Sequence, residues 1–339
     1  MGLLSLFNKY KPSYYDSFKD LTIHSVIHTS SLYALWYCKD SCASLLTIPI
    51  VGLMNIRTFI IFHDCGHNSY TPSKQLNYII GLILGIFVVT PFCWLYKHNH
   101  HHLTSGNIEN DLNHYQNETI FHTLTEYKHM KGIQKKLYRI VRHPSVFFMI
   151  NPFMFFIILE RFNILLYKII SNHSYKQSFK LILFDTIFNN IGIVILLNYV
   201  IYYGLLYHCL ISLIISFSLG FVLFHNQHTS NPSYVVTNEK WNKKDSGLKG
   251  SSFIQIPKYL KYFTSGIEYH HIHHMNSSIP GYNLQLLHEE VIQKSNEFNN
   301  ITKLSINDCY HNLWLTLYDE SNDKYISFNE ADLKIKKES

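Results

Sequence analysis

Three short histidine-rich motifs contain the residues of this sequence whose types and spacing could do chemistry. They read HDCGH at residues 63–67, HNHHH at residues 98–102 and HHIHH at residues 270–274. On a helix, residues three and four positions apart share one face, so each motif would present two or three imidazole rings to one point. The spacing H-x-x-H-H occurs twice. A random chain with this histidine content would contain about 0.1 copies, so chance does not explain the pattern.

Convergent imidazole rings predict a metal site. Neutral imidazole is a ligand for Fe, Cu, Zn and Ni, and eight rings exceed the four ligands that one tetrahedral zinc ion accepts. We therefore expect two metal ions in a nearly all-nitrogen ligand field, and ligand type alone leaves zinc, copper and manganese open. The predicted ligands are His63, His67, His98, His101, His102, His270, His273 and His274. The carboxylates of Asp64, Asp111 and Glu268 are candidates to orient these rings, with a solvated surface role as the alternative. His100 and His271 occupy positions off the metal face.

The composition indicates which kind of fold must position the rings. Only 15% of the 339 residues are charged and 47% are hydrophobic, whereas an average soluble domain has roughly 25% charged residues. The six cysteines form no C-x-x-C pair, which argues against a thiolate zinc module. The net charge of +6 is spread over segments that flank apolar runs and forms no basic stripe, so we expect no nucleic-acid partner.

Six apolar stretches are candidates for contact with a lipid bilayer, which a helix of about 20 residues can cross. The first is interrupted by His24 and His28, and the fourth contains Glu160 and Arg161, whose charges are costly at mid-bilayer. The long connections carry many Lys and Arg residues, whereas the two short links carry almost none, which places the long connections and both termini in the cytosol. The six stretches are residues 21–37, 43–62, 78–96, 146–167, 181–202 and 205–224.

Ligand convergence tests this topology independently, because all ligands of one centre must lie on one side of the membrane. Only thirty residues separate His67 from His98, too few for two spans. The third stretch must therefore turn back or lie flat, with Pro91 as a break. Both arguments predict an all-α integral membrane protein in which four transmembrane helices form two hairpins and a cytosolic helical cap holds the metal site. The spans are the first, second, fifth and sixth stretches, and six full spans are the alternative.

In its histidine motifs and the residues beside them, the sequence resembles the membrane fatty acid desaturase family, especially its methyl-end acyl-lipid (delta-12/omega-3-like) branch and bacterial members. The resemblance covers residues 55–286. It rests on HDCGH, on W-x-x-x-H-x-x-H-H-x-T-S-G at residues 94–106, and on YHHIHHM followed by IPGYNL within residues 269–286. The segment from Gln227 to Tyr234 also resembles the family. It implies that His228 is the ninth metal ligand, with His225 as the competing residue.

The resemblance implies O2-dependent introduction of a cis double bond into a long acyl chain, carried by a lipid or by CoA, at a centre of two iron ions. It implies an external electron donor of the cytochrome b5 or ferredoxin type, because the sequence contains neither a Rossmann glycine motif nor a fused haem module. A hydroxylase or ketolase on the same centre is the alternative activity. A histidine-rich metal transporter is the alternative from another class, but its ligands would lie near mid-membrane, whereas each cluster here follows an apolar run.

We expect a single desaturase domain over residues 1–339. Its predicted parts are a cytosolic N-terminal segment (1–20), a first membrane hairpin (21–62), the first two histidine motifs with interfacial helices (63–180), a second membrane hairpin (181–224), His228 with the third motif and the cap (225–323), and a loose polar tail (324–339). Lys336 and Lys337 in this tail match a di-lysine retention signal, so we expect the endoplasmic reticulum membrane. The Phe-rich run 147–156 either lines an acyl channel or faces lipid.

Overall fold

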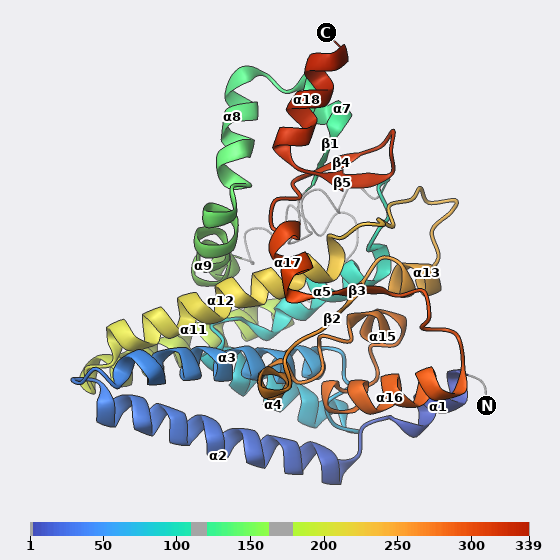
Figure 1. The fold of residues 1–339 in the computed structure, drawn as a ribbon. Coiled ribbons are helices and arrows are strands. Elements are labelled where there is room, and N and C mark those ends of the chain that lie inside the picture. The colour runs from blue at the N-terminus through green and yellow to red at the C-terminus, as the bar shows by residue number, and fades with distance from the viewer. Residues whose placement is uncertain (1–2, 110–120, 163–178, 339) are drawn as a thin grey trace.

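Four long helices lie side by side in the computed structural model, which describes residues 3–109, 121–162 and 179–338 (Figure 1). Their two short links are neighbours, because the imidazole of His208 lies 3.0 Å from the carbonyl oxygen of Lys39. The histidine motifs lie at the opposite end of these helices (Figure 1). The two predicted helical hairpins are therefore present and point the same way. The four helices are α2 (Tyr14–Cys38), α3 (Ser44–Gly66), α11 (Phe179–Tyr202) and α12 (Leu206–His228).

Three of these helices, α3, α11 and α12, are long and apolar enough to cross a membrane. Two bent helix pairs raise the number to as many as five if each pair is one span. Helix α2 has the length but is less apolar, and its buried His24 and His28 both contact Thr58 of α3, at 3.0 and 3.2 Å. The chain is thus mostly helical with several candidate spans, and the count of four remains a prediction.

The third apolar stretch turns back, as the parity argument predicts. Helix α4 (Lys74–Phe87) and the segment Phe92–Thr104 meet at an angle of 107°. Between them, the amide of Thr90 donates to the carbonyl of Gly85 at 2.8 Å, and Pro91 precedes the short helix η1 (Phe92–Trp94). A Cβ atom added at Gly85 would lie 2.5 Å from the Thr90 carbonyl oxygen, so only glycine permits this close return. Helix α5 (Leu95–Thr104) follows and carries the second motif.

The charges of the fourth apolar stretch are paired inside the protein. Glu160 is fully buried and accepts a hydrogen bond from Lys97 at 2.8 Å. Arg161 donates to the carbonyl of Val89 at 2.6 Å and to the side chain of Asn190 at 2.8 Å. These contacts fasten η2 (Val146–Ile150), α9 (Asn151–Ile157) and η3 (Leu159–Phe162) to the turn that follows α4. Burial against partners removes the cost of a bare charge in lipid.

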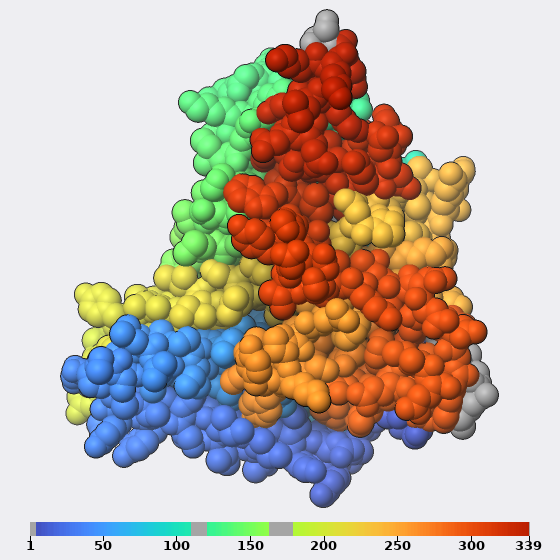
Figure 2. All heavy atoms as spheres, in the orientation of Figure 1, coloured from blue at the N-terminus to red at the C-terminus, as the bar shows by residue number. Residues whose placement is uncertain are grey.

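The cap covers the histidine end of the long helices (Figure 2) and contains two small sheets, so the structure is not purely α-helical. In the first sheet, β4 (Leu317–Asp319) pairs in parallel with β1 (His122–Thr123) and antiparallel with β5 (Lys324–Ile326). In the second, β2 (Ser252–Ile254) pairs in parallel with β3 (Thr302–Leu304). The helices of the cap are α1 (Leu3–Lys9), α7 (Leu124–His129), α8 (Gly132–Val141), α13 (Lys243–Leu248), η4 (Lys258–Leu260), α14 (Lys261–Thr264), α15 (His270–Met275), α16 (Gly281–Lys294), α17 (Ile306–Asn312) and α18 (Phe328–Glu338).

The expectation of a loose C-terminal tail is wrong. Strand β5 pairs with β4 in the register Leu317↔Ile326, and both of these side chains are fully buried. Helix α18 follows and buries Ala331 against a cluster that includes Tyr127 of α7. The ammonium of Lys334 forms an ion pair with a carboxylate of β4. The tail reads as polar because only a few of its residues face this small core.

Helix α8 has an exposed apolar stripe and runs across the direction of the long helices (Figure 1). Ile133, Leu137, Ile140 and Val141 share one face and are 45 to 66% exposed. Lys and Arg side chains occupy other positions of the same helix. Such a helix suits a membrane interface, as the sequence predicts for part of residues 63–180.

Candidate metal centre

Four helix ends bring the predicted ligand rings together. His63 lies in the last turn of α3 and His67 caps its C-terminus, while His98, His101 and His102 lie on one face of α5. Two further elements complete the set, because α12 ends with His228 and α15 consists almost wholly of the third motif. Helix α12 continues four residues beyond the predicted end of the apolar stretch at residue 224. This extension carries His228 to the other rings.

Eight of the nine rings fall into two groups. Within each group the available ring nitrogens lie within 4.8 Å of one another. We call these sets the five-histidine group, formed by His63, His67, His98, His102 and His273, and the three-histidine group, formed by His101, His228 and His274. The ninth ring, His270, adjoins the second group, since its Nε2 lies 2.9 Å from Nε2 of His228.

The contacts between these nitrogens fit metal ions better than hydrogen bonds. Nε2 of His98 lies 2.8 Å from Nε2 of His63 and 3.0 Å from Nε2 of His102. Each ring nitrogen of a neutral imidazole either donates one hydrogen or offers one lone pair. Nε2 of His98 therefore cannot form good hydrogen bonds to both of these neighbours at once. The buried Nε2 atoms of His67 and His274 have no hydrogen-bond partner within the described residues. Cations placed among these lone pairs would satisfy them.

Burial keeps the third motif in the form that ligands require. It lowers the pKa of His270, His273 and His274 well below the usual value, and the neighbouring rings act in the same direction. The rings are therefore neutral, and a neutral imidazole nitrogen can bind a metal ion without first losing a proton.

Asp64 is the carboxylate that orients a ring of the centre. Nδ1–H of His63 donates to Oδ1 of Asp64 at 3.1 Å, and the backbone N–H of Gly281 donates to Oδ2 at 2.6 Å. Glu268 is equally buried but accepts a hydrogen bond from Thr264 at 2.7 Å, and burial raises its pKa. Asp111 lies outside the described residues. Of the three candidates, Asp64 has the geometry of a ligand-orienting carboxylate.

The two rings predicted to lie off the metal face are outside both groups. Nε2 of His271 lies 3.2 Å from Nδ1 of His288, and His100 belongs to neither set. The competing ninth residue, His225, donates from Nε2 to the carbonyl of Asn312 at 2.8 Å. The structure thus places His228, and not His225, with the other rings.

Sequence reasoning missed the neighbours that hold these rings in place. Nδ1–H of His228 donates to the carbonyl of Gly250 at 3.3 Å. The indole of Trp94 stacks on the ring of His98 with centroids 4.6 Å apart. Trp94 falls one turn before His98, so helical spacing could have found this contact. No sequence signal indicates Gly250, because a backbone carbonyl acts whatever its side chain.

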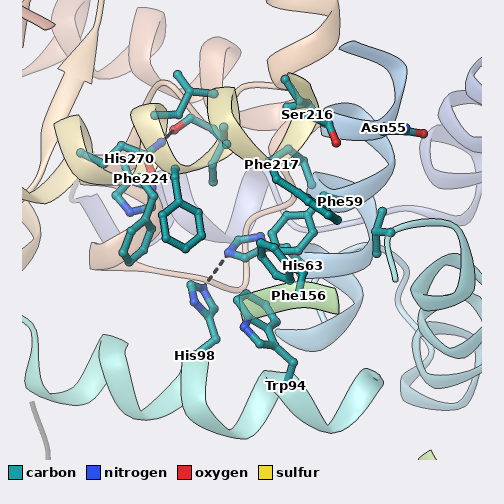
Figure 3. Close-up of a pocket in the computed structure, with 18 residues that line it drawn as sticks. Asn55, Phe59, His63, Trp94, His98, Phe156, Ser216, Phe217, Phe224 and His270 are labelled. Carbon is teal, nitrogen blue, oxygen red and sulfur yellow. Dashed lines mark hydrogen bonds between the residues drawn. The ribbon is translucent and has the colours of Figure 1, made fainter. Parts of the chain in front are cut away.

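An apolar cavity begins at the centre and runs between α3 and α12. We call it the α3–α12 cavity. His63, His98 and His270 lie at one end, and Asn55 and Ser216 lie at the other (Figure 3). Between these ends, the lining is mainly aromatic and aliphatic: Ile56, Phe59, Ile60, Val88, Trp94, Phe156, Phe217, Gly220, Phe221, Leu223, Phe224 and Ile267. Such a cavity can enclose a narrow apolar ligand beside the rings.

The Phe-rich run 147–156 has one buried side and one exposed side. Phe156 lines the α3–α12 cavity, and Phe147 and Phe148 are buried in a cluster with Phe221 of α12. Met149, Ile150 and Met154 are 43 to 56% exposed on the outer side. The run is one amphipathic segment, and its contact with an acyl chain or with lipid stays a prediction.

A second, more polar cavity reaches the three-histidine group from the cap. His101 and His228 form part of its wall, together with Tyr234, Tyr318 and Tyr325. The rings of the centre thus lie between an apolar cavity and a polar one.

Comparisons with known proteins agree with this geometry. The fatty acid desaturase family model matches residues 41–301. A fatty acid desaturase of Bacillus subtilis (strain 168) is 31% identical over 90% of this chain and 84% of its own length. An sn-1 oleoyl-lipid 12-desaturase of Picosynechococcus is 26% identical over 91% of this chain and 85% of its own length. An sn-2 acyl-lipid omega-3 desaturase (ferredoxin) of Arabidopsis thaliana is 36% identical over 22% of this chain and 17% of its own length. Convergent imidazoles, an apolar cavity and these matches lead to one conclusion: the chain belongs to the fatty acid desaturase family.

Proposed function

We propose that this desaturase introduces a cis double bond into a long acyl chain of a membrane lipid, using O2 and a centre of two iron ions. The observation that carries the proposal is the convergence of the imidazoles, three of which (His63, His98 and His270) line one end of an apolar cavity. The name of the Picosynechococcus relative, an oleoyl-lipid desaturase, supports a lipid-linked chain over acyl-CoA.

The five-histidine group would hold one iron ion, and the three-histidine group with His270 would hold the other. When bound, the irons supply the O2-dependent oxidation that no side chain can perform on an unactivated methylene. The side chains of the protein orient the metal-binding rings and keep water away from the acyl chain. Asp64 fixes the ring of His63, and the aromatic wall of the α3–α12 cavity excludes water and holds the acyl chain extended.

The electrons come from a separate donor protein of the ferredoxin or cytochrome b5 type. The name of the Arabidopsis relative includes ferredoxin, which supports the first of these. The cytosolic side of the endoplasmic reticulum membrane is the proposed location of the metal centre and both termini.

The test is expression in a host that lacks polyunsaturated lipids, followed by a full profile of its fatty acids. The wild type is expected to form new double bonds, and His101→Ala is expected to form none. His100→Ala is the matched control, since this neighbouring ring belongs to neither group. New hydroxy acids without a new double bond would overturn the desaturase proposal in favour of a hydroxylase.

A further inference from the structure

Helices α3 and α12, which form the α3–α12 cavity, come into close contact beyond the end that lies away from the metal centre. Helices α3 and α12 run in the same direction and both end at the histidine groups. At their other ends, a Cβ atom added at Gly52 would lie 3.0 Å from the Ser212 carbonyl oxygen and 3.0 Å from Cγ2 of Ile215. The Ser212 hydroxyl also donates to the carbonyl of Ile48 at 3.0 Å. No alkyl chain fits between backbones this close, so this contact closes the cavity just beyond Asn55 and Ser216.

Gly220 occupies the middle of the face that α12 turns toward the cavity. Ser216, Leu223, Phe224 and Gln227 flank it at helical spacing and line the same cavity. A Cβ atom added at Gly220 would meet no atom within 4 Å in the described part of the chain. At Gly81 and Gly192 the same added atom would lie 2.0 and 2.4 Å from a neighbouring side chain. Packing therefore requires glycine at those positions, whereas at position 220 the missing side chain leaves room in the cavity.

The proposed function lets this room be expressed as a number of carbon atoms. Asn55 lies eight residues before His63 on α3, which at 1.5 Å per residue is about 12 Å. A tetrahedral chain of C–C bonds of about 1.5 Å advances by about 1.25 Å per carbon, so roughly ten carbons fit beyond the metal centre. Ser216 lies one helical turn beyond Gly220, so the part past position 220 is about 6 Å deep and holds about five carbons.

We propose that Gly220 sets the depth to which an acyl chain enters, and thereby the position of the double bond counted from the methyl end. The inference rests on the proposed function. The methyl end must enter first, because a polar head group would lose its hydration in this apolar, closed space. The methyl-terminal carbons then pass Gly220 and reach toward Ser216, while the methylenes nearer the head group lie beside the rings.

The test replaces Gly220 by a residue whose side chain blocks the α3–α12 cavity without disturbing the packing of the protein. Gly220→Leu and Gly220→Phe are compared with Gly132→Leu. Position 132 is also a helical glycine whose added Cβ meets nothing within 4 Å in the described chain, but it lies on α8, away from the cavity. Each variant is expressed with saturated fatty acids of graded length, and mass spectrometry of disulfide adducts locates the double bonds. Gly132→Leu is expected to match the wild type.

The expected products of Gly220→Phe have about five fewer carbons between the double bond and the methyl end. Turnover of the longest chains should fall at least about tenfold, since a single misplaced methylene already costs that much in an apolar pocket. Unchanged double-bond positions and unchanged chain-length preference would overturn the inference.

Thermal stabilisation of the metal-loaded protein by added fatty acids keeps the inference testable if Gly220→Phe forms no product. Short chains are expected to stabilise this variant and long chains are not, whereas equal stabilisation by both would contradict the proposal. The two proposals fail separately. A wild type that forms no double bond in any chain overturns the proposed function, while an active wild type with indistinguishable Gly220 variants overturns only the role of Gly220.

Discussion

Asp64→Asn tests whether the carboxylate beside the first histidine motif tunes the metal centre. Asp64 accepts two hydrogen bonds, at 3.1 Å from Nδ1–H of His63 and at 2.6 Å from the N–H of Gly281. An asparagine has one acceptor oxygen, so its NH2 group must face one of these two donors. Losing an orienting partner of a metal-bound imidazole typically costs 10- to 100-fold in metal affinity, which corresponds to about 1.4 to 2.8 kcal/mol.

The assay is competition between the protein and chelators of graded affinity, with the retained iron measured by mass spectrometry. The thermal midpoint of the metal-free protein is recorded beside it, because the lost hydrogen bond also lowers the stability of the fold by about 1 to 3 kcal/mol. Glu268→Gln is the matched control. That carboxylate is also buried and lies near the third motif, but its hydrogen bond comes from Thr264.

We expect Asp64→Asn to shift the chelator competition by 10- to 100-fold and Glu268→Gln to shift it by less than about twofold. Equal affinity in Asp64→Asn and the wild type would refute the reasoning. So would equal losses in the two variants, because burial near the centre would then matter more than contact with the ring.

Two further predictions concern the third motif and the C-terminal helix. His273→Ala should lower the bound metal by at least one ion per chain. His271→Ala removes an equally buried ring that contacts His288 instead, so this variant should keep the metal and lose only thermal stability. Elemental analysis of both variants measures the metal, and equal metal contents would contradict the assignment. Deleting residues 328–338 should expose the buried side chains of Tyr127 and Leu317 and make the surrounding cap sensitive to limited proteolysis. An unchanged digestion pattern would mean that α18 adds nothing to the stability of the cap.

Features that depend on local spacing could be predicted from the sequence. The histidine motifs place their rings on one face of α5 and α15 because the helical repeat alone determines that placement. The turn after α4 followed from chain length, since thirty residues cannot cross a membrane twice. Both short links lie together, as the charge pattern indicates.

Features that depend on contacts between distant segments could not be predicted in this way. Asp64 and Gly281 are 217 positions apart, and nothing local marks either one as the other's partner. The tail after residue 323 seemed loose because β5 has three residues and α18 buries few side chains, too little apolar pattern to detect. Glu160 argued against a membrane span, but nothing local in the sequence marks Lys97 as the partner of its carboxylate inside the protein.

The histidine groups bring four helices, α3, α5, α12 and α15, together at one point. Residues 63 and 274, at the ends of the set, belong to elements made early and late in synthesis, so the last ligands arrive only after the elements that carry the other ligands have been made. Metal binding then holds the histidine-bearing parts of α3, α5, α12 and α15 together. Ligand binding of this kind adds directly to the free energy of folding. The amount of intact enzyme in a cell should accordingly follow the metal supply, since chains that miss this step keep several buried lone pairs unsatisfied and stay open to degradation.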